Sequence, residues 1–190
     1  MLTLAFTAFA LAAPPPDLGQ EPDRVMSLGL SLSPLIGTDV SGGGLGQATI
    51  QVHLPPVTPE ILGAEGAMSG PTRTVGFIAV GLRKHIAYGT WARVLFAHHH
   101  ETLWADFIDH PGASLAGVDS QITHRSGVDV GFGWERPIGG KLVGDRLVVD
   151  LGAFVRVFPG KVDPPVYVGL QIGVSGRVGP EWKRKHAPEP

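Results

Sequence analysis

The chain lacks several features that mark common classes of protein. It has no cysteine, which removes disulfides and thiolate metal sites. Its net charge is −2, so it has no global basic field that would attract nucleic acid. Although 43% of its 190 residues are hydrophobic, no window approaches the ~20 apolar residues of a membrane-spanning helix. We therefore expect neither nucleic acid as a partner nor a helical membrane span.

Turn-forming residues, by contrast, are abundant. The chain contains 27 glycines and 17 prolines, a composition that opposes a helical bundle and favours many strands joined by turns. The length suits one domain.

The N-terminal segment resembles a secretory signal peptide. It is apolar from Leu2 to Leu11 and carries an A-x-A pattern at residues 10–12, although no lysine or arginine follows Met1. The alternative is a buried N-terminal helix, but the prolines that follow favour export. We predict a signal peptide at residues 1–13, a proline-rich linker at 14–23, a β-barrel at 24–178 and a polar tail at 179–190.

A period of two residues, typical of strands, recurs along the rest of the chain. In the segment 147–158, the residues Leu147, Val149, Leu151, Ala153, Val155 and Val157 alternate with a face that carries Asp150 and Arg156. Six other segments show the same alternation: 24–36, 46–54, 74–86, 90–104, 126–135 and 166–178. Each is about ten residues long, which is enough to cross a bilayer when tilted.

The two faces of these strands predict opposite surroundings. Each unpaired backbone group at a strand edge in lipid costs several kcal/mol, so such strands must close into a barrel. We predict that Leu151 and Leu170 face acyl chains. The charged residues then face a polar lumen: Arg83, Arg93, Glu135, Asp150, Arg156 and Arg177. The alternative is a soluble periplasmic barrel that binds an apolar ligand, with the faces inverted, but lysine, typical of a solvated surface, is scarce.

The predicted fold is all-β: a single small antiparallel up-and-down transmembrane β-barrel. Seven strands are visible, and bacterial barrels have even numbers, so we predict eight. Either the eighth strand lies in residues 55–72, or the N-terminal segment is misassigned. The tight turn 87–89 and the long loop 105–123 are expected at opposite ends. The pattern resembles small Gram-negative outer-membrane barrel proteins, which implies an outer-membrane location and contact with its lipids and lipopolysaccharide. A barrel this small fills its interior with side chains, which argues against a pore.

Titratable residues gather around the long loop. Antiparallel pairing of Trp104 with His124 would place His99 close to Asp129 in the lumen, with Glu101 one pair along. These three could bind a metal ion, but a hydrogen-bonded network with Arg93 is the preferred interpretation, so we expect no metal or other cofactor. By parity His98, His100, His124 and Ser126 face outward, and we expect His98 and His100 at the level of the lipid headgroups.

The tripeptide His124-Arg125-Ser126 resembles the H-x-S motif of the lipid A 3-O-deacylase family of outer-membrane barrels. The resemblance implies ester hydrolysis on the membrane face, with His124 as general base and Ser126 as nucleophile. The sequence departs from the family in two ways. Gly127 stands where the family usually has asparagine, and no obvious acid is present to orient the histidine. Loop residues Asp106, Asp109 and Asp119 are possible acids. Our primary prediction is a barrel with a structural, adhesive or interaction role, and the hydrolase is the alternative.

Overall fold

A computed structural model of the chain describes residues 24–54, 56–69, 72–87, 89–116, 118, 122–138, 146–160 and 164–181. The predicted signal peptide (1–13) and linker (14–23) lie outside these residues, as does the tail beyond residue 181. Those boundaries stay predictions.

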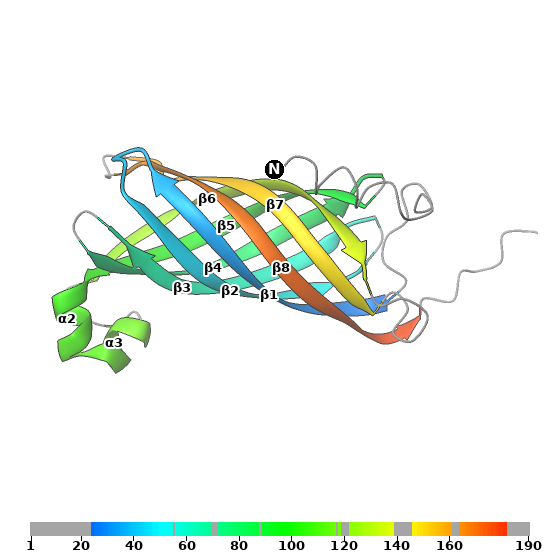
Figure 1. Cartoon of the computed structure of the whole chain (residues 1–190), viewed down its shortest axis with the longest axis horizontal. Helices are drawn as coiled ribbons and strands as arrows, with labels where there is room; N and C mark the ends of the chain where they lie inside the picture. The colour runs from blue at the N-terminus through cyan, green and yellow to red at the C-terminus, as the bar shows by residue number, and fades with distance from the viewer. Residues whose placement is uncertain are drawn as a thin grey trace, which may run out of the picture.

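Eight antiparallel strands form a closed up-and-down barrel, in which each strand pairs with its neighbour in sequence and β1 pairs with β8 (Figure 1). Their bounds are β1 Arg24–Gly37, β2 Gly42–Val52, β3 Thr58–Met68, β4 Arg73–His85, β5 Thr90–Leu103, β6 Thr123–Pro137, β7 Leu147–Val157 and β8 Val166–Glu181. Closure leaves no strand edge unpaired, which is what the hydrocarbon core of a membrane requires. The predicted fold class and strand count are confirmed.

The strand that the alternation did not reveal is β3, which lies within residues 55–72 as expected for the eighth strand. Its inward face mixes Glu60 with Leu62 and Ala64, and its outward face mixes Ile61 with Glu65. Neither face is uniformly apolar, so the two-residue period of hydrophobicity is weak there. The pairing with β2 and β4 is nevertheless continuous.

The exterior of the barrel is apolar and its interior is charged. On β8, Leu170 is 55% exposed and Ile172 is 58% exposed, whereas Arg156 on β7 is fully buried. A soluble barrel would place these side chains the other way round, so the alternative of a soluble periplasmic barrel with an inward apolar face is wrong. A closed barrel with an apolar outer belt and a polar inside is the arrangement of outer-membrane proteins.

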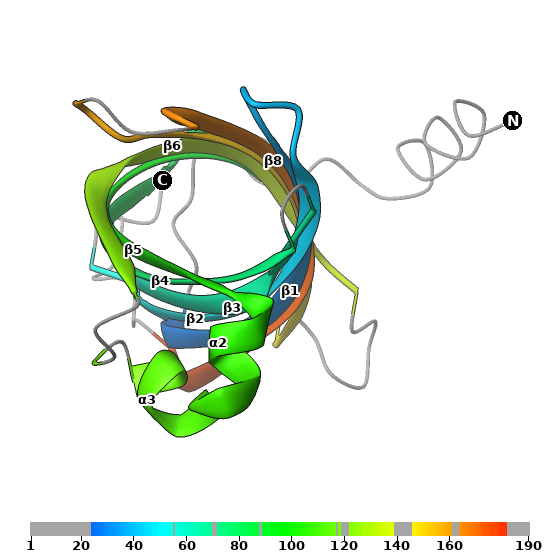
Figure 2. The same ribbon diagram turned by 90° about the vertical axis from the view of Figure 1, so that its left-hand side faces the viewer.

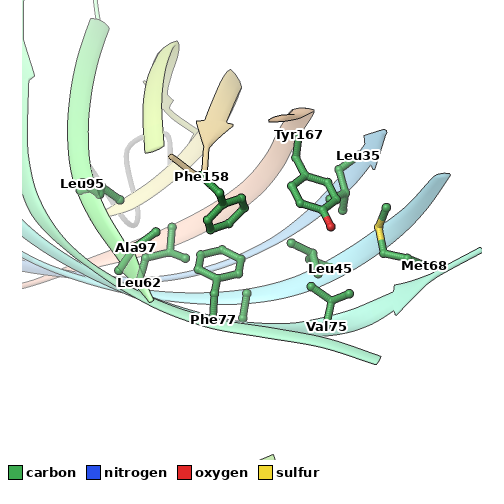
Figure 3. Close-up of a cluster of buried hydrophobic side chains, with 12 residues drawn as sticks. Leu35, Leu45, Leu62, Met68, Val75, Phe77, Leu95, Ala97, Phe158 and Tyr167 are labelled. Carbon is green, nitrogen blue, oxygen red and sulfur yellow. The ribbon is translucent and has the colours of Figure 1, made fainter. Parts of the chain in front are cut away.

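The interior is divided along the barrel axis. An apolar cluster fills the end towards which β1 and β3 run, with Phe77, Phe158 and Tyr167 facing one another across the lumen (Figure 3). Its aliphatic members include Leu35, Leu45, Leu62, Met68, Val75 and Leu95. Towards the other end, where β3 begins and β4 ends, the buried side chains are mostly polar or charged.

The two ends of the barrel also differ in their connections. The start of β1, the end of β8 and the turn between β4 and β5 lie at one end. The long segment between β5 and β6 lies at the other and contains two short helices, α2 (Trp104–Asp109) and α3 (Pro111–Ala116). Viewed along the axis, these helices lie beside the ring of strands and leave its opening uncovered (Figure 2). In the described part of the chain, no helix is long and apolar enough to cross a membrane.

Candidate functional site

Glu60 is the centre of an ion-pair network inside the barrel. The inward parity of β3 places its carboxylate against two guanidinium groups: Arg83 Nε lies 2.6 Å from Oε2, and Arg93 Nη1 lies 3.0 Å from Oε1. Arg83 also contacts Asp150 at 2.8 Å. All four side chains are buried. Each charge therefore has an opposite charge within contact distance, which is the condition under which buried ions are tolerated.

Asp129 extends this network along the lumen. Its two carboxylate oxygens accept hydrogen bonds from Arg93 Nε at 3.2 Å and Arg156 Nη2 at 3.0 Å. Aromatic rings cover the guanidinium groups: Arg83 lies 4.0 Å from the Trp91 ring centroid and Arg156 lies 3.5 Å from that of Phe77. These cation–π contacts add attraction in a site without bulk water. The predicted inward orientation of the lumen charges, including Arg177 beside Glu135, is confirmed.

The three predicted metal candidates do not converge on one point. His99 Nε2 lies 2.9 Å from Glu101 Oε1, and the Tyr167 hydroxyl donates to the same oxygen at 2.5 Å. Asp129 lies instead with Arg93 and Arg156. Within the described ranges, no group of three or more histidines and carboxylates is arranged to hold a metal ion.

The three residues do not converge because the register between β5 and β6 differs from the predicted one. His100, not Trp104, pairs with His124, so His99 lies opposite Arg125 and Asp129 lies opposite Leu95. The expected pairing of Trp104 with His124 is wrong by four residues, because β5 ends at Leu103 and Trp104 begins α2. The shift is an even number, so every side chain keeps its predicted face.

A second polar network lies at the end of the barrel that carries the helices. Arg73 Nη2 contacts Asp39 Oδ2 at 3.2 Å and Arg73 Nε contacts Glu101 at 3.5 Å. Asp39 belongs to the turn between β1 and β2. Burial raises its pKa, but hydrogen bonds from Ser41 and Arg73 outweigh that effect and leave the pKa below its ordinary value. These ion pairs therefore lie at the same end of the barrel as the apolar cluster.

The exterior carries a polar cluster, which we call the histidine patch: Glu65, His98, His100, His124 and Ser126. His124 Nδ1 and His98 Nε2 are hydrogen-bonded at 3.2 Å, and their rings stack with centroids 5.3 Å apart. His100 Nε2 lies 3.6 Å from Glu65 Oε1. The outward parity of β3, β5 and β6 brings these groups together near the strand ends that lead to the helices.

Gly76 makes the contact between His100 and Glu65 possible. It lies on β4, between the two strands that carry them, and pairs with both residues. A Cβ atom at this position would lie 2.4 Å from His100 Nε2 and 2.5 Å from Glu65 Oε1. Only glycine leaves room for the imidazole and the carboxylate to meet across the intervening strand.

The structure places the predicted catalytic residues on one exposed face. Ser126 pairs with His98 across the strands, and His124 precedes it by two positions on β6. The His124 ring is hydrogen-bonded to His98, and in the described part of the chain no ion pair joins it to a carboxylate. Sequence reasoning missed Glu65, the carboxylate of the patch, because its strand showed no clear alternation.

The patch combines a hydroxyl group, three imidazoles and a carboxylate on the membrane-facing side of the barrel. Imidazoles linked to a carboxylate can accept a proton from a nearby hydroxyl group, and the same groups can hydrogen-bond to lipid headgroups. Both kinds of chemistry would act on molecules held in the membrane and not on molecules in the lumen.

Comparison with known proteins identifies the fold. No protein-family model matches the chain, and no curated protein matches it. Among solved structures, the chain is similar to Neisserial surface protein A, with a TM-score of 0.50 and 11% identity over 80% of this chain and 96% of that one. The comparisons do not support the resemblance to the lipid A 3-O-deacylase family.

Two further structures resemble the chain less closely. Ail, the attachment invasion locus protein of Yersinia pestis, gives a TM-score of 0.45 and 11% identity over 83% of this chain and 99% of that one. A barrel from the de novo design of transmembrane β-barrels gives a TM-score of 0.45 and 13% identity over 84% and 99%. At these identities likeness concerns the fold alone. Together with its apolar exterior, the eight-stranded fold makes this chain an outer-membrane β-barrel protein.

Proposed function

We propose that the protein has a structural or interaction role in the outer membrane and acts through its surfaces, not as a pore. The observation that supports this is the filled lumen. Arg83, Arg93 and Trp91 are buried in the lumen towards the end opposite the helices, and they belong to one network of ion pairs and ring contacts. Small barrels packed in this way leave no continuous aqueous path.

The surfaces left for interaction are the lipid-facing belt and the end with the helices. The belt would contact outer-membrane lipids and lipopolysaccharide. The end with the helices presents the longest connection of the barrel, with exposed apolar residues such as Trp104 and Ile108. Exposed apolar groups on a rigid scaffold are typical of sites that contact other molecules.

Conductance measurements test the absence of a pore. The purified protein is inserted into planar bilayers beside a general porin as a positive control, and both are also tested for sugar uptake by vesicles. We expect no stepwise conductance and no uptake. Stable single-channel steps from correctly folded protein would overturn this part of the proposal.

A loop replacement tests the interaction role. The chain is expressed in the outer membrane of a laboratory Gram-negative strain, together with a variant in which a short glycine–serine turn replaces residues 105–121. We expect cells with the intact chain to differ from variant cells in adhesion to matrix-coated surfaces or in resistance to detergent. Equal behaviour in both assays, with equal amounts of folded barrel, would contradict the proposal.

The histidine patch favours a second candidate, an ester hydrolase that acts on lipid A. Ser126 lies beside His98 and His124, and the contact between Glu65 and His100 supplies a carboxylate on the same face. In this reaction the Ser126 hydroxyl adds to the acyl carbonyl while an imidazole takes its proton. The lipid alcohol leaves with that proton, and water then hydrolyses the acyl-serine to a free fatty acid.

Mass spectrometry of lipid A tests this candidate. We expect loss of one acyl chain in cells that express the chain, and no loss with Ser126→Ala. The variant Ser175→Ala, which alters an inward-facing serine on β8, is the matched control and should behave as the unaltered chain. An unchanged acyl count with folded protein in the outer membrane would remove the hydrolase.

A further inference from the structure

The helix α2 has an apolar face that the barrel does not cover. Trp104, Phe107 and Ile108 occupy positions i, i+3 and i+4, which share one side of a helix. Trp104 is 44% exposed and Ile108 is 58% exposed, and the Trp104 and Phe107 rings stack with centroids 5.5 Å apart. Asp106 and Asp109 lie on the opposite side. This arrangement is amphipathic within a helix of six residues.

The position of α2 relative to the barrel is fixed by its contacts. It follows β5 directly, and the Trp104 backbone N–H donates to the Thr72 carbonyl at 3.1 Å, just before β4. Thr74 and Thr102 face outward by parity, yet they are only 8% and 5% exposed. The wall of the barrel is therefore covered on its outer side at this rim. In Figure 2 the helices accordingly lie outside the ring of strands.

We propose that α2 is an interfacial anchor, which lies in the headgroup region of the outer leaflet with Trp104, Phe107 and Ile108 against the acyl boundary. The occupant of this apolar face is lipid, because the helix continues the strand whose outward residues Val94 and Phe96 already form the lipid-facing belt. Tryptophan is enriched at this depth in membrane barrels, because its ring is apolar and its N–H is polar.

A protein partner fits this face less well. Three side chains on a helix of six residues form a small surface, whereas stable protein interfaces bury about 1,200–2,000 Å² in total. The lipid contact needs no such area, since the belt supplies most of the membrane contact. Asp106 and Asp109 lie on the side of the helix opposite this face, so the face itself carries no charge.

The anchor has a consequence for the histidine patch. His100 lies on β5, four residues before Trp104, the first residue of α2. A helix fixed at the headgroup level therefore also fixes the depth of the patch. The histidines would then meet the polar part of outer-leaflet lipids and not their acyl chains. The anchor rests on the membrane location of the barrel, and its test is independent of both activities proposed above.

The absence of cysteine allows a direct test. Ile108→Cys on the apolar face and Asp109→Cys on the polar face are each labelled with a nitroxide, and the full-length protein is inserted into phosphatidylcholine vesicles. Collisions of each label with oxygen, which concentrates in the bilayer, are compared with collisions with a water-soluble nickel complex. Far-ultraviolet circular dichroism checks that both variants are folded.

We expect the ratio of oxygen to nickel collisions at position 108 to exceed that at position 109 several-fold. Equal ratios, with both labels accessible mainly to nickel, would show a helix in water and overturn the anchor. A label at position 108 that is shielded from both reagents would show a protein contact, such as a second copy of the chain, and would also overturn it.

Discussion

Glu60 and Glu65 belong to the same strand but have opposite surroundings. Glu60 faces the lumen, where it is fully buried and contacts Arg83 and Arg93. Glu65 faces outward, is 48% exposed and contacts His100 at 3.6 Å. The inner carboxylate balances charges that cannot reach bulk water, while the outer one lies near the rim. Their contributions to stability should therefore differ.

We predict that Glu60→Gln lowers the free energy of unfolding by about 3–5 kcal/mol, because it leaves two buried guanidinium groups without their shared counter-ion. The matched change Glu65→Gln should alter it by less than about 1 kcal/mol, as for exposed pairs. Urea titration of the protein in phospholipid vesicles, followed by tryptophan fluorescence, measures both. Equal effects would mean that the buried network is not a main source of stability.

Glycine on the inner wall makes room for the largest buried ring. A Cβ atom at Gly152 would lie 2.7 Å from Cζ2 of Trp91. We predict that Gly152→Ala destabilises the barrel by about 1–3 kcal/mol through overpacking. Trp91→Leu should remove most of this penalty in the double variant.

Gly176→Ala is the control for the loss of glycine itself, because no atom lies within 4 Å of a Cβ built there. It should leave the free energy of unfolding nearly unchanged in the same urea titration. If Gly152→Ala lowers the free energy of unfolding by the same amount with and without Trp91, the close approach of the ring is not the cause of the destabilisation.

The sequence was sufficient to predict whether a side chain on a strand faces outward or into the lumen. Parity placed His98, His124 and Ser126 outside and Asp129 inside, because alternation along a strand does not depend on its partners. Contacts between strands were not predictable in this way. Glu65 meets His100 only because a third strand carries glycine between them, and no pattern within any one strand indicates that arrangement.

At the scale of elements, β3 and the hairpin of β5 and β6 show what limits such predictions. Alternation is strong only where one face of a strand is uniformly apolar, and β3 places carboxylates on both faces. The hairpin register depends on where the strands end. Residues 104–109 form a helix instead of continuing β5, which moves the pairing by four residues.

The outward face of β8 provides a test of the lipid-facing belt. Ile172 lies near the middle of the strand, and Val178 lies near its end on the same face. We predict that Ile172→Arg costs about 2–4 kcal/mol of folding free energy in a bilayer, while Val178→Arg costs about 0–1 kcal/mol, because the penalty for a charge falls towards the interface. Equilibrium folding into phosphatidylcholine vesicles measures both values, and the reverse order would contradict the assignment of the belt.

At the scale of the whole molecule, one physical condition explains both the exterior and the interior. Lipid outside requires closure of the sheet and apolar outward residues. Closure with eight strands leaves a lumen narrow enough to be filled, and the inward residues fill it with paired charges, glycines and rings. We therefore expect the interior to serve stability, and the functions proposed above use the exterior and the end that carries the helices.

Two neighbouring residues of β8 allow a direct measurement of which face of the strand contacts lipid. Single cysteines replace Ile172 and Gln171, are labelled with a small fluorophore, and the protein is inserted into vesicles that contain lipids brominated on their acyl chains. We predict strong quenching at position 172 and little at position 171. Strong quenching at 171 with none at 172 would contradict it, because the apolar face would then line the inside of the barrel.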